Sequence, residues 1–234
     1  MNKKPCIIKM RTIVKVALIL LSILIIYIFL QKKYLNRFNN DIEIFQIENP
    51  NKAQFEKQIE QSYPSIFTNM TQNFHDLQKY SLKTISSIEP DERKKLNRNI
   101  NKHFNYYTAP LSKNSTNTLK VLSEGKGITN TVTRQFNYRY LITQLKGVRK
   151  IYLFSPKNRK YLYAKGNKSQ VDFFRDDLLA LPKLAETKYI EIVLYPGQML
   201  YIPFNWWYNY EIIEDSFAVY QQSDTLFSKY LLKN

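Results

Sequence analysis

Between residues 195 and 207 the chain reads YPGQMLYIPFNWW, a short apolar run enclosed by turn signals. Pro196-Gly197 predicts a tight turn, because proline presets φ at one central position and glycine accepts a positive φ at the next. Leu200 and Ile202 alternate onto one face of an extended strand, which Pro203 ends. The adjacent Trp206 and Trp207 add large, rigid apolar surface. The stretch predicts one strand of a β-rich core.

Short apolar runs separated by turn residues begin at about Leu119 and continue toward the C-terminus. These runs are ITNTVTRQF, YLITQL, RKIYLF, YIEIVLY, QMLYIP and SFAVYQQ. Many short strands with few helices are typical of an antiparallel sandwich or jelly roll. The aromatic share of 15% agrees with a β-rich fold, because aromatic side chains are enriched in strands.

The region before these runs, residues 41–118, predicts mainly helices with two short strands. Asp41–Ile47 alternates apolar and acidic residues, which is typical of an edge strand, and residues 64–67 predict a short buried strand. Asn49-Pro50 resembles a helix start ahead of the amphipathic stretch KAQFEKQIEQ. Further helices are predicted after Asn69, after Pro90 and at the C-terminus from Thr225.

Residues 16–30 read VALILLSILIIYIFL and are apolar apart from Ser22 and Tyr27. Extending the run back to Thr12 gives a length just sufficient for a helix across a hydrocarbon core of about 30 Å. The core helix of a globular protein rarely shows an apolar face all the way round. A cleaved signal peptide is the other alternative, but no small-residue cleavage site follows Leu30. We predict an uncleaved transmembrane helix at residues 12–30.

Half of the formal net charge of +16 lies in residues 1–37, which hold eight Lys/Arg and no Asp/Glu. Lysine and arginine residues commonly flank a membrane-spanning helix, which accounts for the charge of residues 1–37. The remaining positive charge is not accompanied by a nucleic-acid recognition motif, so nucleic acid is not an expected partner. Five of the eight cations precede the apolar run 16–30, which favours a cytosolic N-terminus and a lumenal or external domain. Cys6 is the only cysteine, which excludes a disulfide framework within the domain.

Two blocks of sequence carry a resemblance to a known family. They are residues 144–156, QLKGVRKIYLFSP, and residues 195–207, with SQVDF at 169–173 between them. Together they resemble the JmjC/cupin-like family of iron and 2-oxoglutarate dioxygenases, particularly its asparaginyl-hydroxylase-like branch. The resemblance covers most of the chain beyond residue 40. It implies a mainly β fold with α, in which a double-stranded β-helix (jelly roll, or cupin) follows a helical N-terminal part.

The expected chain order therefore has four parts. They are a short basic tail (1–11), the transmembrane helix (12–30), a linker (31–40) and a JmjC/cupin-like domain (41–234). Within this domain, residues 41–118 form the helical part, 119–224 the barrel and 225–234 a C-terminal helix. The lipid bilayer is the first expected partner of such a chain.

Members of the family bind iron through a His-x-Asp/Glu pair and a distant His, a triad that leaves coordination positions open for 2-oxoglutarate and oxygen. The resemblance puts these positions at Arg134, Phe136 and Tyr208. Arginine does not lose its proton to bind a cation, phenylalanine has no donor atom, and a lone tyrosine is a poor Fe(II) ligand. The two histidines, His75 and His103, both precede the β-rich part. We therefore expect a metal-free barrel and no cofactor.

Some co-substrate positions of the family retain polar residues. The resemblance places Thr131 where a hydroxyl often touches 2-oxoglutarate, and Tyr140 where an asparagine is frequent. It places Arg149 where a lysine usually pairs with the distal carboxylate of 2-oxoglutarate. Trp207 lies beside the position of the distal metal ligand. These four residues are the candidate ligand-binding residues.

Three functions remain open at this point. The first is a catalytically inactive dioxygenase homologue that acts as a membrane-anchored binding or scaffold module for an unknown protein. The second is an Fe(II)/2-oxoglutarate-dependent protein hydroxylase with an atypical site. The third is a domain that binds a small carboxylate ligand through Arg134, Arg149 and Lys150. We also hypothesise that the Arg134 guanidinium takes the place of the metal charge, with Phe136 and Tyr208 filling the pocket.

Overall fold

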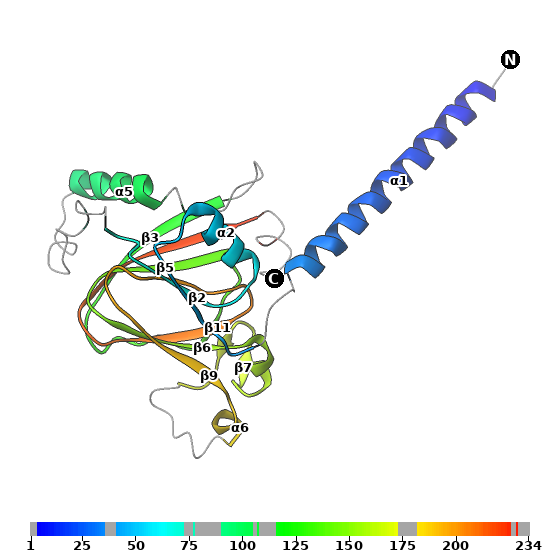
Figure 1. Ribbon diagram of the computed structural model, residues 1–234. Helices are drawn as coiled ribbons and strands as arrows, with labels where there is room; N and C mark the ends of the chain where they lie inside the picture. The colour runs from blue at the N-terminus through cyan, green and yellow to red at the C-terminus, as the bar shows by residue number, and fades with distance from the viewer. Residues whose placement is uncertain are drawn as a thin grey trace. The chain divides into compact units, whose positions relative to one another are not determined.

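Two six-stranded sheets account for the β-rich part of the chain, ordered β1-β2-β10-β5-β12-β3 and β7-β8-β4-β11-β6-β9 (Figure 1). The computed structural model describes residues 4–35, 41–72, 77, 90–104, 107, 116–172, 182–225 and 228. The first sheet contains β1 (Phe45–Glu48), β2 (Ser65–Thr68), β3 (Thr116–Glu124), β5 (Arg139–Lys146), β10 (Met199–Tyr201) and β12 (Ser216–Asp224). The second contains β4 (Thr133–Arg134), β6 (Arg149–Phe154), β7 (Ala164–Lys165), β8 (Lys168–Ser169), β9 (Tyr189–Leu194) and β11 (Trp207–Ile212).

Every strand pair is antiparallel except β1 with β2, which is parallel. The chain alternates between the sheets from β3 to β6 and again from β9 to β12, whereas β6 to β9 all lie in the second sheet. The result is a mostly β structure with helices. Its strand order is consistent with the expected jelly roll.

Alternating side chains of the two sheets form the main hydrophobic core between them. Strands of the first sheet contribute Ile142, Leu200 and Tyr220, and strands of the second contribute Leu153 and Ile192. Period-two alternation sends every second residue of a strand to the same face, so the short apolar runs of the sequence become one inner layer. This layer forms the hydrophobic core between the two sheets.

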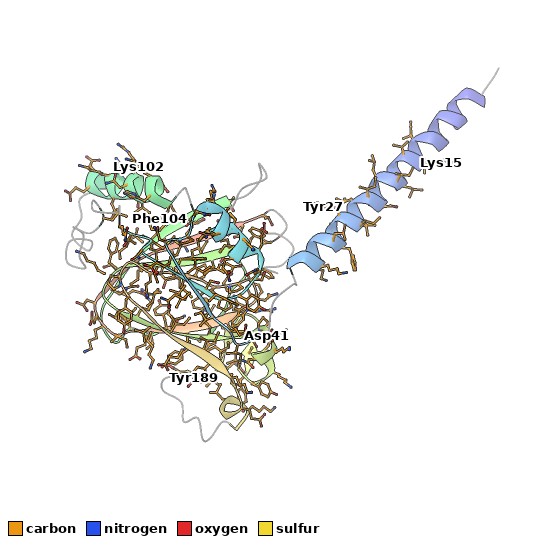
Figure 2. The ribbon with its side chains drawn as sticks, in the orientation of Figure 1. Lys15, Tyr27, Asp41, Lys102, Phe104 and Tyr189 are labelled. Carbon is orange, nitrogen blue, oxygen red and sulfur yellow. The ribbon has the colours of Figure 1, made fainter. Side chains whose placement is uncertain are left out.

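Two helices, α2 (Lys52–Glu60) and α5 (Pro90–Phe104), cover the outer face of the first sheet (Figure 1). Helix α2 begins after Asn51, whose side chain accepts a hydrogen bond from the Gln54 backbone in a capping box. Figure 2 shows Phe104 of α5 directed toward the sheet and Lys102 directed away from it. Arg139 of β5 is buried and donates to Glu56 of α2 at 2.6 Å, which ties the helical part to the barrel.

The outer face of the second sheet is covered by the connection between β6 and β9 and not by long helices. Phe154 and Trp207 of the sheet pack against Leu162, Val171 and Leu184. These last three residues come from the chain between β6 and β9, which includes the 3₁₀ helix η2 (Pro156–Lys160) and the short helix α6 (Pro182–Ala185). Trp207 therefore lies in an outer layer and not in the barrel interior.

The N-terminal helix α1 (Lys4–Leu35) belongs to a separate unit, residues 1–37. It is longer than the predicted span 12–30, because charged residues at its two ends continue the helix beyond the apolar run. The segment Ile13–Leu30 is long and apolar enough to cross a membrane, and none of its side chains is buried within the described part of the chain. Figure 2 shows the Lys15 and Tyr27 side chains extending outward from this helix.

Most predicted elements of the domain are present, with shifted ends. The Pro196-Gly197 turn is confirmed, because the Gln198 N–H donates to the Tyr195 carbonyl at 3.1 Å and Gly197 has a φ of +89°. The predicted edge strand 41–47 lies at Phe45–Glu48 and is indeed at a sheet edge. The predicted helices after Asn69 and at 225–234 fall mainly outside the described residues.

The run ITNTVTRQF is the one predicted strand that is much shorter in the structure, where only Thr133–Arg134 pair as β4. The Thr133 hydroxyl donates to the Thr131 carbonyl at 2.8 Å. A local side-chain hydrogen bond of this kind competes with ladder formation, which explains why β propensity alone overestimated the strand.

Candidate ligand-binding site

The register between β4 and β11 decides which candidate residues face the barrel interior. Thr133 pairs with Tyr208 and Arg134 pairs with Trp207. Directly opposed residues of an antiparallel pair share a face. Since Tyr208 packs on the inner core and Trp207 on the outer layer, Thr133 faces inward and Arg134 faces outward.

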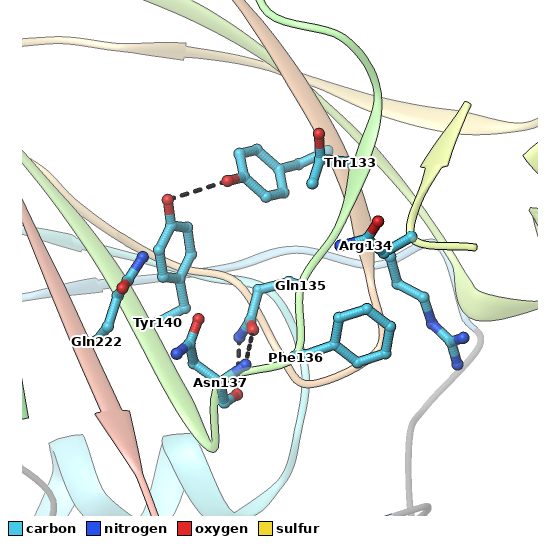
Figure 3. A pocket seen from close by; sticks show the side chains of 9 residues that line it. Thr133, Arg134, Gln135, Phe136, Asn137, Tyr140 and Gln222 are labelled. Atoms are coloured by element: carbon cyan, nitrogen blue, oxygen red, sulfur yellow. Dashed lines mark hydrogen bonds between the residues drawn. The ribbon is translucent and has the colours of Figure 1, made fainter. Parts of the chain in front are cut away.

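Arg134 lies over two aromatic rings of this outer side. Its guanidinium carbon is 4.9 Å from the centroid of Phe136 and 5.8 Å from that of Trp207. Burial, and next the positive charge of Arg159, lower the pKa of Arg134 below its usual range. Figure 3 shows the Arg134 and Tyr140 side chains on opposite sides of Phe136. The structure therefore does not support the hypothesis that the Arg134 guanidinium replaces the metal charge beside Tyr208.

A cavity of about 370 Å³ nevertheless brings several candidate residues together at this end of the barrel (Figure 3). Its lining is Thr133, Arg134, Gln135, Phe136, Asn137, Tyr140, Asn167, Tyr208 and Gln222. Amide, hydroxyl and phenol groups dominate, and no carboxylate is among them. Such a lining suits a ligand with neutral hydrogen-bonding groups beside an aromatic surface.

A pair of tyrosines closes the inner end of this cavity. The Tyr140 and Tyr208 hydroxyls are 3.0 Å apart, and their ring centroids are 5.5 Å apart. Burial is the main cause that raises the pKa of both phenols, well above the usual range for Tyr140. Tyr208 therefore remains a protonated phenol that is hydrogen-bonded to its neighbour. Coordination by tyrosine uses the phenolate, so a metal ion here would have to displace this proton and break the hydrogen bond to Tyr140.

Arg149 is completely buried and already has a carboxylate partner. Its Nη2 donates to Glu124 Oε2 at 2.7 Å and to the Ser216 hydroxyl at 3.2 Å, and its Nη1 donates to the Tyr220 hydroxyl. The ring centroid of Tyr210 lies 4.4 Å from the guanidinium carbon, and the Tyr210 hydroxyl donates to Glu124 Oε1 at 2.5 Å. The resemblance expects Arg149 to bind the carboxylate of a ligand. In the structure, Glu124 on β3 already neutralises the charge of Arg149.

The remaining candidate residues lie elsewhere. Thr131 is exposed, Trp207 is completely buried in the outer layer, and neither lines the cavity. Lys150 projects from the face of β6 opposite to Arg149 and pairs with Glu191 at 2.8 Å. Arg134, Arg149 and Lys150 therefore do not converge on one site, which removes the geometric basis of the small-carboxylate hypothesis.

The side chains at the three positions that the resemblance assigns to the metal ligands do not fit an iron ion. Arg134 is a cation on the outer face, Phe136 has no donor, and Tyr208 is a protonated phenol. Across the ranges that the structure describes, no three His, Cys, Asp or Glu side chains cluster as a metal site would require. His103 lies on α5, outside the cavity lining, and His75 falls outside the described residues.

Five lining residues were not predicted from the sequence: Thr133, Gln135, Asn137, Asn167 and Gln222. Three of them flank Arg134 and Phe136, so a search that included the neighbours of the metal positions would have found them. Gln222 of β12 and Asn167 of the β7–β8 turn come from distant parts of the chain. Only the pairing of strands brings these two residues to the same cavity.

Comparison with known proteins shows a similarity to cupin-like proteins over part of the chain. Residues 122–220 match the family described as "Cupin-like domain". The human tRNA wybutosine-synthesizing protein 5 is 36% identical over 80 residues, which is 34% of this chain and 25% of that protein. The Danio rerio lysine-specific demethylase 8 is 35% identical over 100 residues, 41% of this chain and 25% of that protein. The JmjC domain-containing protein D of Dictyostelium discoideum is 33% identical over 85 residues, 34% of this chain and 19% of that protein.

The aligned part thus spans about a quarter or less of the length of these relatives. Their names nevertheless correct one expectation. The prediction that this chain uses no cofactor is wrong, because its homologues, a demethylase and a wybutosine-synthesizing protein, support a family that uses one. The family implies a cofactor, whereas Arg134, Phe136 and Tyr208 do not fit its iron.

Proposed function

Because residues 122–220 form a cupin-like domain of the JmjC/cupin-like family, we propose that the chain is a membrane-anchored jelly-roll binding or scaffold module. In this proposal the 370 Å³ cavity is the contact site, and the barrel is not catalytically active as a dioxygenase. The partner is a protein segment that offers hydrogen-bonding groups and a surface for Phe136. This role uses the fold of the family without its oxygen chemistry.

One observation carries the proposal, namely the state of the three metal positions. Two of them, Arg134 and Phe136, stack on one another at the rim of the cavity. The third, Tyr208, is hydrogen-bonded to Tyr140. Oxygenase chemistry of this family requires an iron centre with open coordination positions, which these side chains do not support. A protein hydroxylase with an atypical site is the alternative, supported by the named activities of the relatives.

Turnover of 2-oxoglutarate separates the two functions. We expect the purified full chain, supplied with Fe(II), ascorbate and 2-oxoglutarate, to release succinate no faster than a heat-denatured sample. The assay should be repeated with the Tyr208→Phe variant, which retains the ring but loses the hydroxyl at the third position. Succinate release by the wild-type chain that disappears in Tyr208→Phe would overturn the binding-module proposal and support the hydroxylase.

We further propose that α1 anchors the domain with a cytosolic N-terminus, so that residues 38–234 lie on the lumenal or external side. This orientation rests on the excess of cations before the apolar segment. In sealed microsomes, an epitope tag at the C-terminus should resist added protease and become sensitive when detergent opens the membrane. Digestion of the tag in intact microsomes would reverse the orientation.

A further inference from the structure

The segment between β6 and the end of β8 is strongly basic. Residues 155–171 contain five cations and no acidic residue. The cations are Lys157, Arg159, Lys160, Lys165 and Lys168, and all five are exposed. In the described part of the chain, none of them is paired with a carboxylate, in contrast to Lys150, Arg139 and Arg149. Their charge is therefore available to a partner.

A backbone hydrogen bond adds a further cation from a different part of the chain. The Arg134 N–H donates to the Asn167 carbonyl at 2.8 Å, so Arg134 lies beside the β7–β8 turn. Lys168 pairs with Thr133 and Lys165 pairs with Lys168, so these two lysines share the face of Thr133, opposite to Arg134. Arg134 is close enough to Arg159 for the charge of Arg159 to lower its pKa. Like charges that lie together without counter-charges raise the local positive potential, which favours binding of anions. We call the four residues Arg134, Lys157, Arg159 and Lys160 the basic face.

The basic face is concave and includes aromatic side chains. A cavity of about 510 Å³ is lined by Lys157, Arg159, Lys160, Tyr163, Ala164 and Gln170. The Lys160 ammonium lies 4.6 Å from the ring centroid of Tyr161. Tyrosines beside lysines are typical of surfaces that meet the headgroup layer of a membrane, where one end of the side chain is apolar and the other is hydrated.

The length of the tether favours a lipid surface over a soluble polyanion. Only residues 36–44 lie between the end of α1 and the start of β1. An extended chain of this length reaches about 30 Å, so a domain anchored by α1 remains close to the headgroups. Tethering raises the effective concentration of lipid at the domain, so that individually weak contacts with phosphates suffice.

We propose that the basic face docks on the phosphate-bearing headgroups of anionic lipids in the membrane that α1 anchors. This inference rests on the anchored part of the proposed function. It adds a second binding surface, which lies on the outer side of the second sheet and is distinct from the 370 Å³ cavity apart from Arg134. Docking would hold the cavity at a defined height above the bilayer.

Lysine footprinting on the full chain tests the docking. The chain is reconstituted into nanodiscs of phosphatidylcholine, or of phosphatidylcholine mixed with phosphatidylserine, and acetylated under limiting conditions. We expect Lys157 and Lys160 to react at least about threefold more slowly on the anionic discs, with the difference decreasing at high salt. Lys95 and Lys102 of α5, on the other side of the domain, provide the internal control and should react equally on both discs.

Charge reversal supplies a matched pair of variants. Arg159→Glu should abolish the protection of Lys157 and Lys160, whereas Lys95→Glu should leave it intact. Equal labelling of the wild-type chain on both discs would overturn the proposal. Protection by an added RNA oligonucleotide on neutral discs, without protection on anionic discs, would instead identify a nucleic-acid surface. If the chain does not co-purify with either disc, the membrane anchor itself is refuted.

Discussion

Replacing Glu124 by alanine is expected to destabilise the barrel by about 3–5 kcal/mol, because it leaves the buried Arg149 cation without its carboxylate. Arg149 has no exposed surface, and the Glu124 side chain is only 15% exposed. The cation then keeps only the hydroxyls of Ser216 and Tyr220 as hydrogen-bond acceptors. Removing one member of a buried ion pair costs far more than the pair contributes, since the remaining charge has lost its water.

Urea unfolding followed by tryptophan fluorescence measures this effect. Trp206 and Trp207 are the only tryptophans and both are buried in the domain, so the signal reports the domain and not α1. Glu191→Ala is the matched control, because it removes the partner of Lys150 at a similar distance of 2.8 Å but with 44% exposure. Its expected cost is below about 1 kcal/mol. Equal losses in the two variants would contradict the assignment of Glu124 as the internal counter-charge.

A compensating double variant strengthens the same test. Glu124→Leu combined with Arg149→Met removes both charges and replaces them with apolar side chains. The double variant should recover most of the stability that Glu124→Ala loses, because no uncompensated charge remains in the core. Failure to recover would show that the loss arises from packing and not from the unpaired cation.

The second large effect is expected for Gly147→Ala, which should destabilise the domain by about 3 kcal/mol or more. Gly147 lies in the two-residue connection between β5 and β6 with a φ of +70°. A Cβ atom at this position would lie 2.1 Å from the Asp215 carbonyl oxygen and 2.9 Å from that of Glu214. Both contacts are with backbone atoms of the β11–β12 turn, so no flexible side chain can move aside.

Gly166→Ala separates conformational strain from this collision. Gly166 has a similar φ of +64° but would place its Cβ in open space. We expect it to cost about 1–2 kcal/mol, the strain of a left-handed backbone alone. Thermal or urea unfolding of both variants gives the comparison. Equal costs for the two substitutions would show that the close approach of the two turns does not limit stability.

The sequence contained enough information for the strand pattern of the domain and for its family. Runs such as RKIYLF and YIEIVLY are local signals, because a strand that buries one face must alternate apolar side chains. The predicted RKIYLF strand coincides with β6, Arg149–Phe154. The apolar segment before residue 31 is also a local signal. Its length and composition are sufficient to identify a candidate membrane helix.

The chemistry of individual residues required the tertiary structure. Arg134, Phe136 and Tyr208 were identified as a set from the sequence, yet the antiparallel register turns Arg134 outward and Tyr208 inward. A shift of one residue reverses the face of a strand, and no local pattern sets the register between β4 and β11.

Arg149 is a second residue whose role could not be predicted from the sequence. The sequence identifies it as a cation that could bind an acid, and only the fold shows that Glu124 already occupies that role at 2.7 Å. The two residues lie on β3 and β6, which belong to different sheets. Sequence by itself determined which side chains the domain contains, and the resemblance predicted Arg134, Phe136 and Tyr208 at the metal positions of the family. The packing of two sheets decided which of those side chains meet, because contacts across the core depend on pairing between residues far apart in the chain.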